Sequence, residues 1–136
     1  MNGRLDSLQA AVLLEKLTIF DEELSLRAKI SNQYRNTLKN YQYIPNNYTS
    51  SHALFSIILE SNQERNKTIE IFQQNNIPTM IYYKYPIHLM KAFSFLGYKK
   101  GNFLISENLS KRILSLPMHP YLSENDIELI ILILEK

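Results

Sequence analysis

The side chains of this sequence that could do chemistry are few and widely spread. The three histidines, His52, His88 and His119, lie far apart, and their spacing matches no metal-binding motif such as HExxH. The three glycines are too dispersed to form a phosphate-binding loop. The sequence has no cysteine, which excludes disulfides, zinc ribbons and thiol nucleophiles, and no serine lies in a nucleophile motif. These residues predict neither a catalytic centre nor a metal site.

Two short segments combine prolines, aromatic residues and a histidine. In residues 82–88 (YYKYPIH), His88 and the tyrosine hydroxyls could bind an anion or a sugar, although the pattern by itself favours a surface turn anchored by aromatic packing. In residues 115–120 (SLPMHP), two prolines flank His119 and predict a rigid bend with a structural role. The nine tyrosines are scattered, which does not indicate an aromatic platform for RNA.

The composition is that of one globular domain. The chain has 136 residues, of which 45% are hydrophobic and 21% charged, and its net charge of +2 comes from basic and acidic residues that are mixed along the chain. No block of like charges indicates a nucleic-acid partner. The longest apolar run, residues 127–134, is too short for a membrane span. With no signal-peptide pattern and no cysteine, the sequence predicts a cytoplasmic protein without nucleic-acid or membrane partners.

The elements that would position these side chains begin with helix. Asp6 followed by Gln9 is a capping pattern, and no glycine or proline interrupts residues 5–44, so one long helix or two abutting helices are expected. Two apolar stripes with helical spacing follow: Leu13, Leu17, Phe20 and Leu24, then Tyr34, Leu38 and Tyr41. Residues 45–51 have the composition of a loop.

Strands and helices alternate in the rest of the chain. Residues 52–60, 79–83 and 113–116 are predicted strands, and a helix capped by Ser61 and Glu64 and ended by Asn75 and Asn76 joins the first two. Residues 84–112 are expected to be mostly loop, with a short helical piece near 89–96. Ser123 and Asp126 should cap a last helix. Its predicted inward-facing residues are Ile127, Ile130, Ile131 and Leu134. The predicted fold class is α/β of the α+β type, with a small mixed or antiparallel three-stranded sheet and covering helices.

Four ordered motifs carry a resemblance to a known family. Residues 2–11 (NGRLDSLQAA) resemble G-x-N-x-R-(L/M)-D-x-(L/I)-Q-A-A, and residues 76–79 (NIPT) resemble a Gly-Ile-Pro-Thr element. Residues 83–89 (YKYPIHL) resemble Y-x-x-P-(L/I)-H-L, and Glu107 with residues 114–120 (LSLPMHP) resembles E-x(6)-LSLPM-x-P. The chain thus resembles the DegT/StrS family of PLP-dependent nucleotide-sugar aminotransferases. It departs from the family at Leu104, where a proline is common.

The resemblance implies a domain organisation. Such enzymes are similar in fold to aspartate aminotransferase (fold type I), are homodimers with active sites at the subunit interface, and have a large PLP-binding domain followed by a small C-terminal domain. Residues 1–136 would be that small domain, with residues 1–44 helical and residues 45–136 an α/β sheet unit. The Schiff-base lysine and the acidic partner of the pyridinium nitrogen lie upstream of the first motif in the family. The large PLP-binding domain is therefore expected to be absent here, and pyridoxal 5'-phosphate is not expected to be bound covalently.

Some residue roles follow from the resemblance. Asn2 matches the asparagine that reaches the cofactor phosphate of the neighbouring subunit, with a polar residue leading the helix as the alternative. Arg4 matches the motif arginine, which could bind an anionic substrate group or form a structural ion pair. Tyr83 and His88 become candidates for binding the nucleotide-sugar, whereas His52 and His119 are expected to be structural. No catalytic residue is assigned within the chain.

The implied parent activity is transfer of an amino group from glutamate to a nucleotide-linked keto-sugar, as in the biosynthesis of cell-surface polysaccharides or amino sugars. We expect the 136 residues to be inactive alone, and to form a homo-oligomer or to associate with the missing large domain. The alternatives are a non-catalytic binding or regulatory module and a remnant of a split gene.

Overall fold

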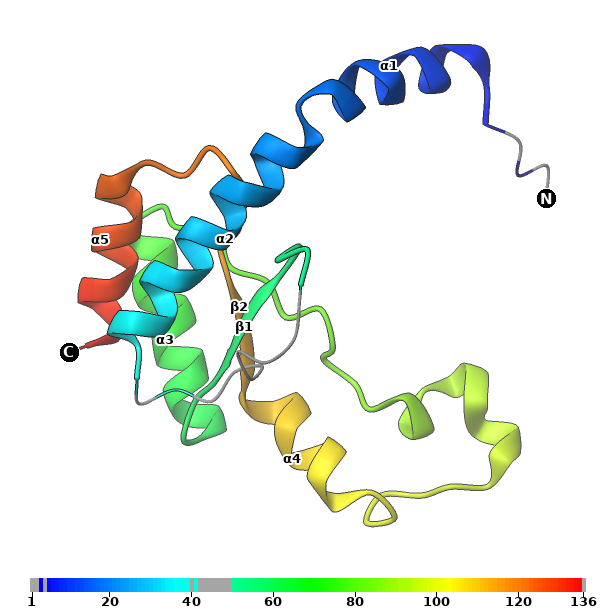
Figure 1. Cartoon of the computed structure of the whole chain (residues 1–136). Coiled ribbons are helices and arrows are strands. Elements are labelled where there is room, and N and C mark those ends of the chain that lie inside the picture. The colour runs from blue at the N-terminus through cyan, green and yellow to red at the C-terminus, as the bar shows by residue number, and fades with distance from the viewer. Residues whose placement is uncertain (1–2, 4, 40, 42–49, 136) are drawn as a thin grey trace.

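The computed structural model describes residues 3, 5–39, 41 and 50–135. Figure 1 shows two successive helices, a small sheet with helices packed against it, and an extended segment between the strands. The elements in chain order are α1 (Ser7–Thr18), α2 (Phe20–Thr37), β1 (Phe55–Ile58), α3 (Asn62–Gln74), the 3-10 helices η1 (Ile87–Leu89) and η2 (Lys91–Leu96), α4 (Leu104–Arg112), β2 (Ile113–Leu116) and α5 (Glu124–Leu134). The predicted α/β class is confirmed, but the predicted three-stranded sheet is wrong, because the sheet of the described residues has two strands.

The sheet joins residues that are far apart in the sequence. β1 and β2 are antiparallel, with Phe55 opposite Leu116 and Ile58 opposite Ile113. The predicted strand at 79–83 is wrong in extent, because it is reduced to a single bridge in which Met80 and Ser115 exchange two backbone hydrogen bonds of 3.3 and 2.9 Å. The chain turns at residues 82–83, immediately after this bridge, so no longer ladder forms.

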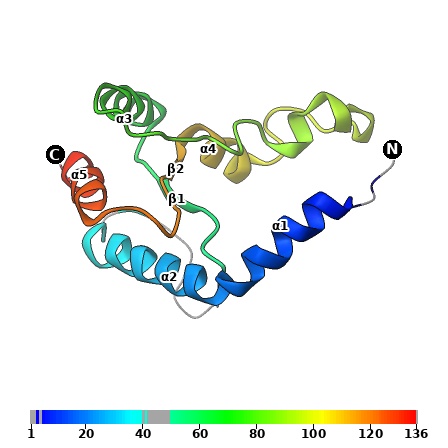
Figure 2. The same cartoon turned by 90° about the horizontal axis from the view of Figure 1, so that it is seen from above.

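The core lies on one face of the sheet, between the strands and helices α2, α3 and α5, as Figure 2 shows. Tyr34 from α2 is fully buried. Its ring centroid lies 5.0 Å from that of Phe55, and its hydroxyl donates a hydrogen bond of 3.1 Å to the carbonyl of Pro117. Most of the predicted inward-facing positions of α2 and α5 are buried, and Ile131 is partly buried. The buried ones are Tyr34, Leu38, Ile127, Ile130 and Leu134.

Side-chain caps define several helix ends, as the sequence predicts. The Asp6 carboxylate accepts from the Gln9 amide at 2.8 Å, and the Ser61 hydroxyl accepts from the Glu64 amide at 3.0 Å. Ser123 and Asp126 form a reciprocal capping box. None of the described helices is both long and apolar enough to cross a membrane.

The N-terminal helical segment is two abutting helices that meet at Ile19. α1 points away from the core (Figure 1), and none of its residues is buried. Of the first predicted stripe, Leu13 and Leu17 are more than half exposed, so this stripe has no partner within the described chain. Lys16 and Glu23 form an ion pair of 2.7 Å across the break, and the Tyr121 hydroxyl donates to the same carboxylate at 2.6 Å. Both contacts end on Glu23, in the first turn of α2, and therefore hold the start of that helix in position.

The segment before β2 contains a helix that the sequence reading missed. Residues 87–96 form the expected short helical pieces, but residues 104–112 are helix α4 rather than loop. Phe103 stands at its N-cap without a side-chain hydrogen bond, so the usual Ser, Thr, Asp or Asn signal is missing. Leu104 is the first helical residue, a position that also suits proline, so this departure from the family pattern leaves the helix start unchanged.

Candidate functional site

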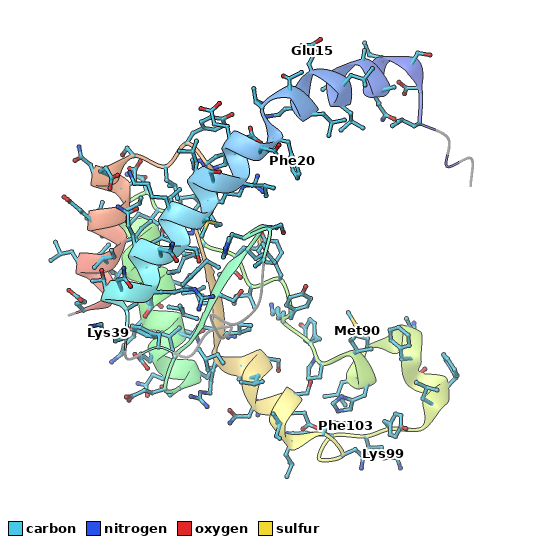
Figure 3. The ribbon with its side chains drawn as sticks, in the orientation of Figure 1. Glu15, Phe20, Lys39, Met90, Lys99 and Phe103 are labelled. Carbon is cyan, nitrogen blue, oxygen red and sulfur yellow. The ribbon has the colours of Figure 1, made fainter. Side chains whose placement is uncertain are left out.

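A buried pair of polar side chains anchors the extended segment 84–103. Nε2 of His88, on η1, lies 3.0 Å from Oε1 of Glu107, on α4, and each side chain is less than a tenth exposed. The His88 ring also packs on Phe103, with 4.8 Å between the ring centroids. In Figure 3 this segment can be followed from Met90 through Lys99 to Phe103, which are labelled. The pair therefore holds η1 against α4 across a large gap in the sequence.

The Glu107 carboxylate organises the turn that leads into α4. Its Oε1 accepts the backbone amides of Gly101 at 2.8 Å and Phe103 at 3.4 Å, in addition to its contact with His88. Burial acts to raise the pKa of this carboxyl, but the hydrogen bonds from Gly101, His88 and Phe103 outweigh it and hold the pKa below its ordinary value. Glu107 is therefore an ionised acceptor that holds the turn leading into α4.

Beside this pair lies a pocket of about 770 Å³. One wall comes from the segment around Pro86 and the other from α4 and the turn before it, and no charged side chain lies among its described lining residues. The aromatic and aliphatic side chains that line it are Tyr83, Tyr85, Pro86, Ile87, Phe103, Leu104, Ile105, Leu109 and Ile113. Such a surface suits apolar contacts and cannot neutralise a phosphate.

A second pocket, of about 930 Å³, has a different character. It is lined by three basic side chains, Arg35, Lys39 and His52, together with serine and tyrosine hydroxyls and apolar groups. Tyr83 and Ile113 line both pockets, so they form the ridge between them. The pKa of His52 is lowered, first by burial and then by the nearby Arg35 charge. The part of the chain that the structure describes contributes no carboxylate to this lining.

The candidate residues predicted from the sequence differ in exposure and in their contacts. Tyr83 is 64% exposed on the ridge, whereas His88 is buried against Glu107. Asn2 and Arg4 lie outside the described residues. His119 is exposed, and its Nδ1 accepts the Tyr121 amide at 3.3 Å.

Sequence reasoning did not single out Arg35 and Lys39, and it expected His52 to be structural. His52 lies well after Arg35 in the sequence, and only the fold brings them to one pocket. For Glu107 a signal existed, because it stands in the fourth motif. These four residues are the additions that the structure makes to the candidate site.

The two pockets differ from what pyridoxal phosphate, the cofactor that the resemblance implies, requires. That cofactor needs a lysine for a Schiff base and an acidic partner for its ring nitrogen. The uncharged pocket offers neither group, and the basic pocket has Lys39 but no carboxylate among its described lining residues. No group of three or more potential metal ligands occurs within the described residues.

The sequence and the fold were compared with known proteins. Residues 1–135 match the model of the DegT/DnrJ/EryC1/StrS aminotransferase family. The chain is 31% identical over 134 residues to the UDP-2-acetamido-2-deoxy-3-oxo-D-glucuronate aminotransferase of Pseudomonas aeruginosa, a match that covers 96% of this chain and 36% of that protein. It is also 31% identical over 134 residues to a pleiotropic regulatory protein of Geobacillus stearothermophilus, with the same two coverages.

The fold matches a crystal structure of an aminotransferase of the same family from Brucella abortus. The TM-score is 0.85 and the identity 42%, over 97% of this chain and 35% of that one. The chain therefore spans about 36% of the length of the curated relatives that it matches.

Proposed function

Since the chain belongs to the DegT/DnrJ/EryC1/StrS aminotransferase family, we propose that it is the small C-terminal domain of a PLP-dependent sugar aminotransferase. The parent reaction would move an amino group from glutamate to a nucleotide-linked keto-sugar. The observation that carries this proposal is the pair of coverages: almost all of this chain aligns with about a third of a family aminotransferase. By themselves the 136 residues would not catalyse the reaction.

The exposed apolar surfaces favour a domain that packs against another domain or subunit. α1 exposes Leu8, Val12 and Leu17 by more than half of their surface, and α4 likewise exposes Leu104 and Ile105. Soluble proteins seldom leave such patches uncovered. We propose that residues 1–136 form one small domain and that a large cofactor-binding domain, within a cytoplasmic homodimer, covers these surfaces.

The cofactor would supply the electron sink for transamination, and this chain would supply contacts around it. Asn2 would donate its amide to the cofactor phosphate, and Arg4 would bind an anionic group of the substrate. Tyr83 would contact the nucleotide-sugar from the ridge between the two pockets. His88 would contact the same substrate through Nδ1, because its Nε2 is hydrogen-bonded to Glu107.

A second candidate function rests on one comparison. The Geobacillus stearothermophilus relative carries the name of a regulatory protein. A module that binds a ligand without catalysis would use the same pockets and would need no large domain. A remnant of a split gene is the third possibility, and it predicts neither ligand binding nor association.

The test supplies the N-terminal part of a family enzyme as a separate chain. The N-terminal two-thirds of a family aminotransferase would be produced, mixed with this chain, and assayed for amino transfer from glutamate to a UDP-linked keto-sugar. Activity that appears only in the mixture would support the C-terminal-domain proposal. Two chains that do not associate would reject it, and ligand binding by this chain alone would then favour the regulatory module.

A further inference from the structure

The direction of α1 is not set by packing in the core. No residue of α1 is buried, and Ile19 and Phe20, where it meets α2, are 37% and 44% exposed. Close packing of buried side chains is what normally fixes one helix against another, so other contacts must set this angle. We propose that Lys16, Glu23 and Tyr121 form a polar clasp that sets the direction in which α1 leaves the core, and that α1 swings when this clasp opens.

The break between the two helices is not caused by a helix-breaking residue. No glycine or proline lies within residues 5–44, although these residues are common causes of a sharp kink. The charges beside the break favour two helix ends, since Lys16 lies in the last turn of α1, and Asp21, Glu22 and Glu23 lie in the first turn of α2. Cations stabilise the C-terminal end of a helix and carboxylates the N-terminal end. These charges favour a break but do not fix the angle between the helices.

One carboxylate oxygen of Glu23 is the centre of the clasp. Oε1 accepts the Lys16 ammonium at 2.7 Å and the Tyr121 hydroxyl at 2.6 Å, so it joins α1, α2 and the segment before α5. The Glu23 side chain is only 11% exposed. The hydrogen bonds from Lys16 first and Tyr121 second hold the pKa of this carboxyl below its ordinary value. Glu23 is therefore an ionised acceptor, and hydrogen bonds to a charged acceptor are the stronger kind.

The spacing of Lys16 and Glu23 links the clasp to the bend. Ion pairs within one helix ordinarily join residues three or four apart, whereas residues seven apart are separated by about 10.5 Å along the axis of an uninterrupted helix. A kink shortens this separation on its inner side, so the contact between Lys16 and Glu23 favours the bent form. Glu15 and Phe20, labelled in Figure 3, lie on the two sides of the break. Tyr121 then relates the bend to the core, because its segment leads into α5.

The clasp matters because α1 carries an uncovered apolar surface. Leu8, Val12 and Leu17 are each more than half exposed, and the direction of α1 decides where a domain or subunit that covers them would lie relative to the sheet. With the clasp closed, α1 has one direction. With the clasp open, α1 samples a range of directions, because no buried side chain of α1 holds it against the core. This inference goes beyond the proposed function and does not depend on it.

The test measures the distance between α1 and the core in the 136-residue chain. The sequence has no cysteine, so Gln9→Cys on α1 and Lys67→Cys on α3, both at exposed positions, give two unique sites for spin labels. Pulsed electron paramagnetic resonance, in an excess of unlabelled chain, then reports distances within one molecule. The chain with an intact clasp should give one narrow distance distribution. Glu23→Gln and Tyr121→Phe should each lose this narrow distribution and give a wide one.

Glu22→Gln is the matched control, because it removes the same charge from the same turn of α2 at an exposed position outside the clasp. It should keep the narrow distribution. Equal widening in this control would mean that charge at the start of α2, and not the clasp, sets the bend.

A distribution that stays narrow in either clasp variant, or that is already wide in the chain with an intact clasp, would overturn the proposal. Tyr121→Phe removes only the hydroxyl of a side chain that is 64% exposed, so it tests the clasp even if Glu23→Gln fails to fold. Amide NMR signals of β1 and β2 show whether each variant is folded. The two-chain activity assay is independent of these distances, so a failure of the proposed function and a failure of the clasp are distinguishable.

Discussion

Nε2 of His88 lies 3.0 Å from Oε1 of Glu107, and this contact joins the two walls of the uncharged pocket. The same carboxylate oxygen accepts two backbone amides of the turn before α4. One oxygen thereby sets the position of η1, of the turn and of the start of the helix. The shape of the pocket depends on Glu107 although Glu107 does not line it.

Glu107→Gln should destabilise the protein in a pH-dependent way. The folded pKa of Glu107 lies below its ordinary value, so its contribution to the free energy of unfolding is complete above the unfolded pKa of about 4.3. That contribution is lost as the pH falls through the folded pKa. Urea unfolding at pH 7 should show a less stable variant, and the difference from the wild type should shrink toward pH 3. A difference that does not change with pH would show that shape, and not charge, matters at this position.

The same substitution should loosen the turn more than the sheet. Amide exchange at Gly101 and Phe103 should become roughly tenfold faster, because a neutral acceptor binds these amides more weakly. Amides in β1 and β2 should be affected no more than global stability requires. Equal acceleration at all sites would mean that Glu107 supports the whole fold and not the pocket wall in particular.

The isolated chain should neither bind the cofactor covalently nor transaminate. The resemblance places the Schiff-base lysine outside these residues, and neither the uncharged pocket nor the basic pocket combines a lysine with a carboxylate among its described lining residues. Mixing the chain with pyridoxal phosphate should give no stoichiometric absorption band from a lysine-bound cofactor. A family aminotransferase of full length serves as the positive control. A stoichiometric band that disappears on substitution of one lysine of this chain would contradict the prediction.

The chain should self-associate through α1 when no large domain is present. Leu8, Val12 and Leu17 are 78%, 59% and 64% exposed and form an apolar surface. Light scattering should show a mass that rises with concentration, and replacing the three residues with serine should abolish the rise. Leu132→Ser removes a side chain that is 53% exposed on α5, and should leave the association unchanged. A wild-type chain that stays monomeric at high concentration would show that this surface needs no partner.

Asn2→Ala should act on cofactor affinity in a reconstituted two-chain complex. Losing a hydrogen bond to a charged phosphate typically costs about 1–3 kcal/mol, so the dissociation constant for the cofactor should rise roughly 5- to 150-fold. His88→Ala should leave that constant unchanged and raise the KM for the nucleotide-sugar. Fluorescence titration with pyridoxal phosphate and steady-state kinetics separate the two effects. Cofactor affinity that is indifferent to Asn2→Ala would remove this residue from the site.

Local patterns predicted the helix ends well, because capping depends on side chains a few residues apart. Asp6, Ser61 and Ser123 all cap as expected. α4 was missed because its N-cap residue is Phe103, which has no side chain that can cap a helix, and the contacts of Glu107 that hold the preceding turn depend on tertiary structure. The strand predicted around Met80 was too long. The turn at residues 82–83 ends the pairing after one bridge, and the apolar pattern of the sequence does not indicate this turn.

The candidate site was predictable only where motifs cover it. Tyr83 and His88 lie in a motif, but the sequence gives no indication that His88 is buried against Glu107. Arg35 and His52 belong to different segments of the chain, and no periodic pattern in the sequence indicates that they line one pocket. Convergence of distant side chains is a property of tertiary structure, so local patterns could not predict the basic pocket.

The pairing of β1 with β2 has a consequence for how well the domain tolerates changes in chain length. The register from Phe55–Leu116 to Ile58–Ile113 closes a loop that contains the whole segment from η1 to the turn before α4. The entropy of closing a loop grows only with the logarithm of its length, about 0.6 kcal/mol for each doubling. Insertions or deletions near Gly97 would therefore cost little in folding free energy and leave the strand register unchanged. The tip of this segment can therefore change in length without rebuilding the core.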